Sequence, residues 1–562
     1  MSTRISLEQP SSSNVVEKSL IENDSIDSID QERKSVNSYF ERLSKKQKNI
    51  ITYLLIGITS FLMRIIKHDF SDTGNMPVFD EKHYVSQAKE MLTNGGMEYN
   101  PNYGLIVHPP LGKWLLSIGE MIFGYTPLGW RIMPILAGVI TVITTCIIIQ
   151  KITNSYYLTL LASILLNIEG VSLIMSRVGM LDAFVEMFVA LIAMSATFYA
   201  YDEFNKKPLR KSYWLFATGI FGGLMMATKI SGVYYMAFCG ITLVFATLII
   251  SKNVRDTLKS IIMGLFYFVF VPLSIFLMSY IPWFSNENSV YRHAGESGSF
   301  ELSDKLPASL QNFYYYYHGI LNFHTKLETA QSQFHPYESK PWEWAIAARP
   351  MQFLTQKDVF DSLFDDSGEK VSEIVLFANP IIWYLLLPIS IISLIMVILR
   401  KDLRWLIVLG GMISGWIPWI IINERQMYLF YVTAIAPFLI IGIILLIENI
   451  SNYTSSRNHK EEDEKEESDP DENKECSNIE NNNEKSTEED KNRSNKKKII
   501  ISCSYLIISL IMFLILSPWV YGFYISSEYS NFLHDMLPRW GGLTDDNLLT
   551  SFPNLPENPP ED

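Results

Sequence analysis

Apolar residues in this chain are gathered into long, almost uncharged blocks that alternate with polar segments. Runs such as IMPILAGVITVITTCIII (132–149) and YLFYVTAIAPFLIIGIILLI (428–447) reach the ~20 residues with which a helix crosses the hydrocarbon core of a bilayer. They lack the period-2 alternation of a transmembrane barrel, so we predict helices. The pattern predicts an all-α polytopic membrane protein with about 11 transmembrane helices, at residues 50–66, 132–150, 156–175, 182–201, 213–228, 232–251, 261–281, 374–399, 404–422, 428–448 and 499–522.

Basic clusters lie on every second connection between these spans, which orients the chain in the bilayer. Cytoplasmic loops carry an excess of Lys and Arg, and the basic segments are RLSKKQK (42–48), KKPLRK (206–211), SKNVRDTLK (251–259), LRKDLR (399–404) and KNRSNKKK (491–498). We therefore predict that these segments and the N-terminus are cytoplasmic. The two long segments between the other spans, 67–131 and 282–373, are predicted to face the cell exterior or a lumen.

The polar segments set the predicted domain boundaries. Residues 1–49 lack the apolar run of a cleavable signal peptide and are typical of a disordered cytoplasmic tail. Residues 50–450 are predicted as the membrane-embedded core, 451–498 as an acidic low-complexity cytoplasmic loop, and 499–562 as the last transmembrane helix with an external C-terminal tail. Most of the net charge of −13 lies in the tails and this loop, so it does not indicate an acidic protein that seeks basic partners. No nucleic-acid partner is expected. The four cysteines show neither a disulfide framework nor a zinc-site spacing.

The first external segment combines a carboxylate pair with a short apolar helix. FDEKHY (79–84) places Asp80 and Glu81 side by side, and the proline pair 109–110 precedes apolar residues that recur at helical spacing over 111–123. This helix is too short to cross the bilayer and too apolar to stand free in water. We therefore predict that it lies along the membrane surface and that the carboxylates lie at the edge of the bilayer.

Six motifs in the external segments and at the ends of the spans carry a resemblance to one family. They are FDEKHYVSQAKE (79–90), YGLIVHPPLGKWLLSIGEMIFGYTPLGWRIMPILAG (103–138), SRVGMLDAF (176–184), ATKISGVYY (227–235), FHPYESKPWEWAIAARP (334–350) and ERQMYLFYVTAIAPFL (424–439). In this order the chain resembles the protein O-mannosyltransferases over about residues 50–540, and it looks most like the shorter, actinobacterial-type members. The segment 282–373 is too short for the inserted β-trefoil repeat (MIR) domain of the eukaryotic members, so no such domain is expected here.

This resemblance implies a membrane-embedded glycosyltransferase of the GT-C type. Members of the family transfer mannose from a polyprenyl-phosphate mannose to Ser or Thr hydroxyls of exported proteins, with inversion at the anomeric carbon. The expected partners are therefore the lipid-linked donor, secreted or membrane protein acceptors met at the export translocon, and the bilayer. The expected location is the plasma membrane, with the active site on its extracytoplasmic face; the membrane of the endoplasmic reticulum is the alternative.

Such a transfer needs a base for the attacking hydroxyl, and one base suffices for an inverting displacement. Within the matched motif we predict Asp80 as this base. Glu81 is its neighbouring catalytic candidate, which positions either the acceptor or a nearby cation. A solvated charge pair in an ordinary loop is the plain alternative for both.

The leaving group is a lipid phosphate, so cations near the membrane surface should neutralise its charge. Arg131, Lys229 and Arg425 match basic positions of the family and are predicted to bind the donor phosphate. For Arg131 and Arg425 the alternative is that the side chain only extends from a helix end towards water. Lys229 lies in a tight connection between two spans, where a charge is costly unless it is used.

Five further residues are predicted to support the site. Asp182 starts a span, where it either caps the helix or organises Arg177 or Arg131. His108 shapes a turn or contacts a substrate. His335 and Glu338 form a polar cluster among aromatic residues, for which an interfacial aromatic belt is the alternative. No metal-binding spacing is recognisable, so neither a cofactor nor a divalent metal is expected.

Two other functional classes remain in view. A lipid-linked sugar transferase could use a lipid or glycan as its acceptor, although the HPPLGK and FHPYESKPWEW motifs argue against it. A transporter or flippase would also place charges within the membrane, but such proteins usually show paired halves and interrupted helices near the midplane. In this chain the charges gather towards one face and no internal repeat is visible.

Overall fold

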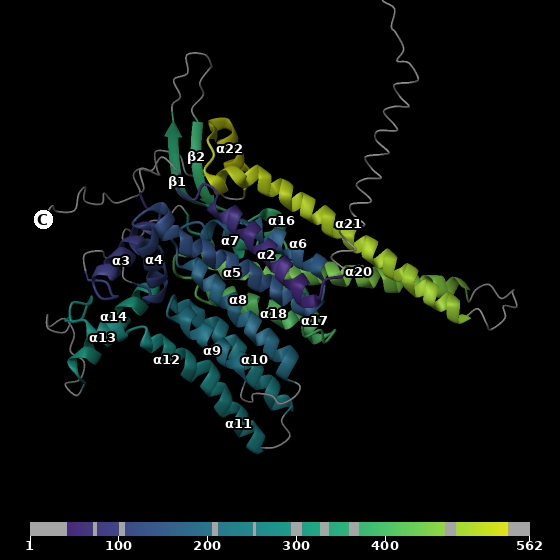
Figure 1. Ribbon diagram of the computed structural model, residues 1–562, viewed down its shortest axis with the longest axis horizontal. Helices are drawn as coiled ribbons and strands as arrows, with labels where there is room; N and C mark the ends of the chain where they lie inside the picture. The colour runs from purple at the N-terminus through teal and green to yellow at the C-terminus, as the bar shows by residue number, and fades with distance from the viewer. Residues whose placement is uncertain are drawn as a thin grey trace, which may run out of the picture. The chain divides into compact units, whose positions relative to one another are not determined.

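Long apolar helices make up most of the computed structural model, which is shown in Figure 1. The structure describes residues 42–70, 76–99, 107–204, 212–250, 254–293, 306–325, 337–358, 370–466 and 479–537. The chain forms two compact units, residues 1–56 and residues 57–562. The candidate site lies wholly within the second unit.

Seven stretches of helix in the described residues are long and apolar enough to cross a membrane. They are α2 (Lys45–Ile65); α5 (Pro127–Thr153); α8 (Asp182–Tyr199) with η2 (Ala200–Phe204); α11 (Val254–Leu265), η4 (Phe266–Phe270) and α12 (Val271–Met278); α16 (Pro380–Trp383) and α17 (Leu386–Ile398); η6 (Leu429–Ile435) and α20 (Ala436–Glu466); and α21 (Ile479–Tyr521).

Four shorter apolar stretches complete the set. They are α6 (Tyr156–Asn167), α9 (Tyr213–Met226), η3 (Ile230–Gly232) with α10 (Val233–Ile250), and α18 (Trp405–Gly415) with α19 (Ile417–Ile421). Each of the predicted spans overlaps one of these eleven helical stretches, so the helical, polytopic fold is confirmed.

One predicted span, 156–175, is broken in the structure. Helix α6 ends at Asn167, and a separate short helix, α7 (Gly170–Met175), follows. Glu169 begins α7, because its carboxylate accepts hydrogen bonds from the backbone N–H groups of Val171 and Ser172 at 2.9 and 2.7 Å. The indole of Trp383 donates a third hydrogen bond to Glu169 at 2.7 Å. The charged residue within this apolar stretch is therefore a buried helix cap.

The apolar helices differ in how deeply they are buried. In the most apolar part of Leu429–Ser451, 89% of the residues are buried, against 22% for Val254–Met278 and for Lys496–Tyr521. A helix that is apolar all round and buried packs inside the protein, whereas one that leaves its apolar surface uncovered suits a lipid environment. Helix α20 and the 3-10 turn η6 that precedes it are therefore central, and η6 reaches the candidate site.

Shorter helices cover the end of the bundle where the site lies. The predicted helix over 111–123 is confirmed, since α4 spans Leu111–Phe123 and follows Pro110. It packs beside α3 (Glu81–Thr93), as Figure 1 shows. The remaining helices are α13 (Ile281–Ser285), α14 (Ala308–Thr325), α15 (Pro341–Trp344) and α22 (Ser527–Met536).

A small antiparallel sheet is present that the sequence analysis did not predict. Strand β1 (Met351–Asp358) pairs with β2 (Lys370–Leu376), which pairs in turn with β3 (Ile525–Ser526). The register runs from Met351 opposite Leu376 to Asp358 opposite Lys370. Figure 1 shows β1 and β2 side by side, with α22 next to β2.

This sheet corrects the predicted span at 374–399. Residues 374–376 belong to β2, and the helical part begins at Pro380. Strand β2 is buried along almost its whole length. Its last three residues, 374–376, are all apolar and join the apolar run that follows them in the sequence. Such a run cannot be separated from a helix by periodicity alone.

The segment predicted as a loop over 451–498 is largely helical where the structure describes it. Helix α20 continues to Glu466, and α21 begins at Ile479. Glu and Lys, which are frequent in this segment, are good helix formers. Low complexity was therefore a poor guide to backbone conformation here.

Candidate active site

A cavity of about 580 Å³ brings together segments that lie far apart in the sequence. Its walls come from residues 79–84, from the loop before α4, from the starts of α8 and η3, from α14, from β1 and from 425–434. The lining is mostly apolar and aromatic with a few charged groups, as is usual for a substrate site. The charged and histidine side chains in it are Asp80, Lys82, His83, His108, Asp182, Lys229, His324 and Arg425.

Asp80 lies directly before α3 and lines this cavity. Within the described residues its carboxylate makes no ion pair and no hydrogen bond, not even a capping bond to its own helix. Burial raises the pKa of Asp80 to about 6, and the negative charge of Asp182 adds to this, while Lys229 acts in the opposite direction. The group is thus largely ionised at neutral pH and free to accept a proton.

Glu81 is the next residue, and its environment is the opposite. It is fully buried, and both carboxylate oxygens are occupied by Arg131, with Nε 2.8 Å from Oε1 and Nη2 2.6 Å from Oε2. The backbone N–H groups of Gly179 and Val78 donate to the same two oxygens at 2.6 and 2.8 Å. A carboxylate with four such partners positions a neighbouring cation, which was one of the two roles predicted for Glu81.

Arg131 is held equally firmly and does not line the cavity. Besides Glu81 it donates to the carbonyl oxygen of His68 at 2.6 Å, and its guanidinium lies 4.1 Å from the centre of the Phe70 ring. This bidentate pair, buried at 1% and 0% side-chain exposure, joins the start of α5 to α3. The structure therefore separates Arg131 from the two other cations predicted to bind phosphate.

Asp182 and Lys229 form a second ion pair, at the cavity wall. Lys229 Nζ lies 2.8 Å from both carboxylate oxygens of Asp182. Asp182 begins α8, as predicted, and Lys229 lies just before η3. The sequence offered Asp182 as an organiser of Arg177 or Arg131, but its partner here is Lys229. An ammonium group has three donors, so Lys229 can still contact a ligand.

Arg425 is a buried cavity cation that has only neutral partners. Its Nη2 donates to the hydroxyl of Tyr431 at 2.7 Å, its Nε to the carbonyl oxygen of Gln426 at 3.2 Å, and its Nη1 to the carbonyl oxygen of His324. All three acceptors are neutral. In the part of the chain that the structure describes, no carboxylate lies within ion-pair distance of this guanidinium. A buried cation without a counterion favours an anionic ligand.

Two stacked imidazoles line the same cavity. The rings of His108 and His324 lie 5.1 Å apart, and Nε2 of His324 is 2.8 Å from the carbonyl oxygen of Val107. Burial and the nearby cations, Lys229 first among them, hold the pKa of His108 well below its usual range; burial lowers that of His324 to about 4. Both rings are therefore neutral near pH 7. Nδ1 of His108 has no partner in the described structure and is available to a ligand.

Aromatic side chains complete the walls. Phe79 stacks on Phe353 of β1 at 4.6 Å between ring centres, and it contacts Phe430 edge-on at 6.4 Å. Tyr428 and Phe430 stack at 5.6 Å. These rings give the cavity flat apolar surfaces beside its charged groups, a combination suited to a sugar with an attached phosphate.

Arg177 and Glu338, two of the other predicted site residues, lie outside this lining. Arg177 is fully buried and donates to the carbonyl oxygens of Met63, Arg64 and Lys67, where it closes the C-terminal end of α2. Glu338 pairs with Lys340 at 2.7 Å. His335 lies outside the described residues.

The prediction that no metal is needed stays a prediction. Among the described residues no three His, Cys, Asp or Glu side chains converge closely enough to hold an ion.

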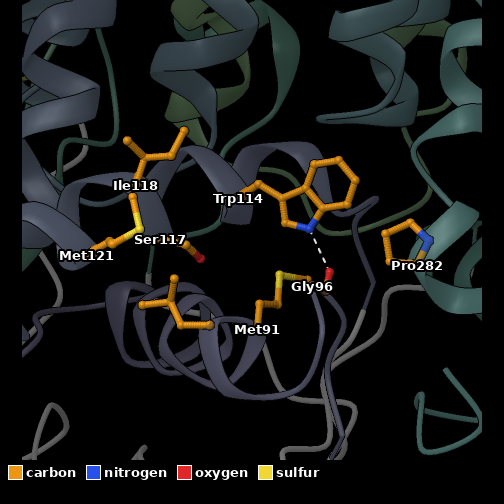
Figure 2. A pocket seen from close by; sticks show the side chains of 8 residues that line it. Met91, Gly96, Trp114, Ser117, Ile118, Met121 and Pro282 are labelled. Carbon is orange, nitrogen blue, oxygen red and sulfur yellow. Dashed lines mark hydrogen bonds between the residues drawn. The ribbon is translucent and has the colours of Figure 1, made fainter.

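A second, smaller hollow between α3 and α4, shown in Figure 2, is almost wholly apolar and bears no titratable group. There the indole of Trp114 donates to the carbonyl oxygen of Gly96 at 2.7 Å. It therefore offers no acid–base chemistry.

Sequence reasoning missed His324, Phe353, Phe430 and Tyr431 as site residues. The last two lie in the quoted motif ERQMYLFYV, where aromatic residues begin three positions after Arg425. That spacing could have drawn attention to them. His324 and Phe353 come from elements that the sequence patterns did not mark.

Comparison with known proteins agrees with this architecture. Residues 107–281 match the family described as dolichyl-phosphate-mannose-protein mannosyltransferase, and residues 309–540 match the C-terminal four TMM region of protein-O-mannosyltransferase. A polyprenol-phosphate-mannose–protein mannosyltransferase of Corynebacterium glutamicum is 35% identical over 427 residues, which cover 70% of this chain and 81% of that protein. The enzyme of the same name from Mycolicibacterium smegmatis is 33% identical, over 73% of this chain and 84% of its own.

A solved structure shares the fold. The Saccharomyces cerevisiae protein O-mannosyltransferase Pmt1-Pmt2 complex, bound to the sugar donor, superposes with a TM-score of 0.63 at 13% identity, covering 86% of this chain and 91% of that one. The helical bundle with its charged cavity is thus a membrane-embedded glycosyltransferase of the GT-C class. Within that class, the chain belongs to the protein O-mannosyltransferase family.

Proposed function

We propose that this chain transfers mannose from polyprenyl-phosphate mannose to Ser or Thr hydroxyls of proteins, with inversion at the anomeric carbon. The names of its relatives support the donor and the protein acceptor. The observation that carries the mechanism is the placement of an unpartnered carboxylate, Asp80, in the same cavity as Lys229 and the uncompensated Arg425.

In this mechanism the hydroxyl oxygen of the acceptor attacks the anomeric carbon while Asp80 takes the hydroxyl proton. The bond between that carbon and the phosphate oxygen breaks, and the lipid phosphate leaves with its pair of electrons. Arg425 and Lys229 stabilise the negative charge that this phosphate gains. A single displacement from the opposite side inverts the anomeric centre, and no enzyme nucleophile is required.

Glu81 and Arg131 have a supporting role in this proposal. Their buried pair fixes the start of α3, and Asp80 is the residue directly before that helix. We therefore assign the donor phosphate to Lys229 and Arg425 rather than to Arg131. His108, with its unpartnered Nδ1 at the same wall, is placed to contact a substrate hydroxyl.

We place the site on the extracytoplasmic face of the plasma membrane, on the basis of the alternating basic loops. Labelling with an impermeant thiol reagent tests this in a chain that lacks the other cysteines. A cysteine at the exposed position Asn288 should react in intact cells, whereas Cys476 should react only after permeabilisation. The reverse pattern would place the cavity on the cytoplasmic side.

The activity is tested with the purified full chain, radiolabelled polyprenyl-phosphate mannose and a peptide that contains a single Thr. The expected product is a mannosylated peptide whose anomeric configuration, determined by NMR, is opposite to that of the donor. A matched peptide with Val in place of Thr should receive none. Transfer to lipid alone, or with retained configuration, contradicts the proposal.

A further inference from the structure

Strand β1 has one edge with which no other described segment pairs, and this edge begins at the candidate active-site cavity. In the sheet order β1-β2-β3, β1 is an outer strand. Across the described residues, no backbone hydrogen bond reaches β1 from any segment except β2. Its first three residues, Met351, Gln352 and Phe353, line the cavity that contains Asp80.

A β-bulge near the start of this strand places one of its side chains against the residue that precedes Asp80, the proposed base. Gln352 pairs with Val375 and Leu354 with Ile374, which leaves Phe353 without a cross-strand partner. Such bulges redirect a side chain, and they are common beside active sites. Here the redirected ring is the one that stacks on Phe79, the residue directly before Asp80. The position of the β1 edge relative to the carboxylate of Asp80 is therefore fixed by this contact.

A free strand edge offers a row of backbone N–H and C=O groups to another extended chain. We infer that this edge binds the acceptor polypeptide as an added antiparallel or parallel strand, which delivers an acceptor hydroxyl to the cavity. The inference rests on the proposed function, because it takes the acceptor to be a protein. Because the edge is continuous with the cavity, we favour the acceptor polypeptide as its partner over a second copy of the chain.

Recognition of this kind has a chemical consequence. Backbone hydrogen bonds supply the affinity, and they are the same for every sequence. In an extended chain successive side chains point to opposite sides, so one hydroxyl enters the cavity while its neighbours point away from it. The enzyme then recognises an extended segment with a hydroxyl at one position, without a sequence motif around it.

The test is a backbone scan on the unmodified full chain with the polyprenyl-phosphate mannose donor. Peptides with one Thr among Ala residues carry a single N-methyl group, moved one position at a time along either side of the Thr. At every second position this change removes a donor that faces β1, and the acceptor KM should rise roughly five- to tenfold per lost hydrogen bond. At the positions between, the same group points away from β1 and serves as the matched control.

An alternating effect on the acceptor KM, with the donor KM unchanged, supports the inference. An effect that is equal at all positions, or absent, overturns it. The peptide without N-methyl groups separates this result from the proposed function. If that peptide is not mannosylated, the proposed function itself has failed.

A crosslinking experiment locates the acceptor on the sheet. Thr355 is exposed on β1, and Glu528 is exposed on α22, next to the opposite edge of the sheet. In a chain without its native cysteines, Thr355→Cys should form a disulfide with a cysteine-containing acceptor peptide, and Glu528→Cys should not. Equal crosslinking at both positions contradicts the inference. If Thr355→Cys instead forms a disulfide between two copies of the protein, the inference is also contradicted, because a second copy then covers the edge.

Discussion

Two neighbouring residues, Asp80 and Glu81, show how the same chemical group is used in opposite ways. Glu81 is fully buried, and its oxygens are occupied by Arg131 and two backbone N–H groups. Asp80 lines the cavity with no partner in the described structure, and its pKa is raised. A carboxylate without partners in a cavity is therefore able to take a proton, whereas one whose oxygens are all hydrogen-bonded holds the backbone in place.

The cations divide in the same way. Arg131 is paired with Glu81 away from the cavity, while Arg425 faces it with only neutral acceptors. Lys229 lies between these cases, since it lines the cavity but is paired with Asp182. The local partner of each charge, and not its presence in a motif, therefore assigns its role.

The largest expected effect is on the base. Asp80→Asn keeps the shape of the side chain but cannot take the hydroxyl proton, so kcat should fall by ~10²–10⁴-fold. Stability should not fall with it. The raised pKa of Asp80 means that ionisation works against folding, so its stabilising contribution is present below the unfolded pKa and is lost as the pH rises through about 6. At pH 7.5 the neutral variant should therefore unfold at the same or a higher temperature. If Asp80→Asn retains more than about a tenth of the wild-type kcat, the base lies elsewhere.

Glu81→Gln should lower the stability of the fold and should not act on the chemical step directly. Removal of one partner from a buried ion pair costs about 3–5 kcal/mol, because the other charge stays buried. Thermal unfolding in detergent should therefore occur at a clearly lower temperature. Glu287→Gln is the matched control, because Glu287 pairs with Arg292 but its side chain is 68% exposed, and exposed pairs contribute little. Similar unfolding temperatures for the two variants would contradict the structural role of Glu81.

Lys229→Met should weaken the use of the donor. Loss of one charged contact to the phosphate corresponds to a rise in donor KM of about tenfold. Lys151→Met is the control, since Lys151 forms a similar pair with Asp202, at 2.6 Å and away from the cavity. A donor KM that changes equally in both variants, or in neither, would remove Lys229 from the phosphate site.

The smallest effect is the pH dependence of the wild-type enzyme. With the pKa of Asp80 near 6, the ionised fraction falls from about 0.9 at pH 7 to about 0.1 at pH 5. The value of kcat/KM should therefore fall by about tenfold over this range, with an acidic limb near pH 6. An acidic limb near pH 4, where an ordinary Asp titrates, would show that the cavity does not perturb this group.

Much of the fold could be predicted from the sequence because bilayer spans have a simple signature. All the predicted spans overlap apolar helices, and the bounds of α4 follow from helical spacing after a proline. The sheet could not be predicted in the same way, since the apolar end of β2, residues 374–376, merges in the sequence with the apolar run of the helix that follows. The helical parts of 451–498 were missed because composition indicates solvation but not backbone conformation.

The site was predicted less completely for a related reason. The family motifs identified Asp80, Lys229 and Arg425 as candidates, and the cavity contains all three. The same motifs gave Arg131 and Glu81 equal weight, because a sequence shows charges but not their partners. His324 and Phe353 come from α14 and β1, and only the folded chain brings them to the other cavity residues.

Equilibrium binding of the polyprenyl-phosphate mannose donor tests the central division of roles most directly, since it separates holding the phosphate from activating the hydroxyl. Isothermal titration of the purified chain should give Asp80→Asn a Kd no weaker than that of the wild type. Arg425→Gln should bind the donor at least about tenfold more weakly, because a buried phosphate contact loses its charge. If Asp80→Asn weakens binding as much as Arg425→Gln does, Asp80 holds the donor and is not the base.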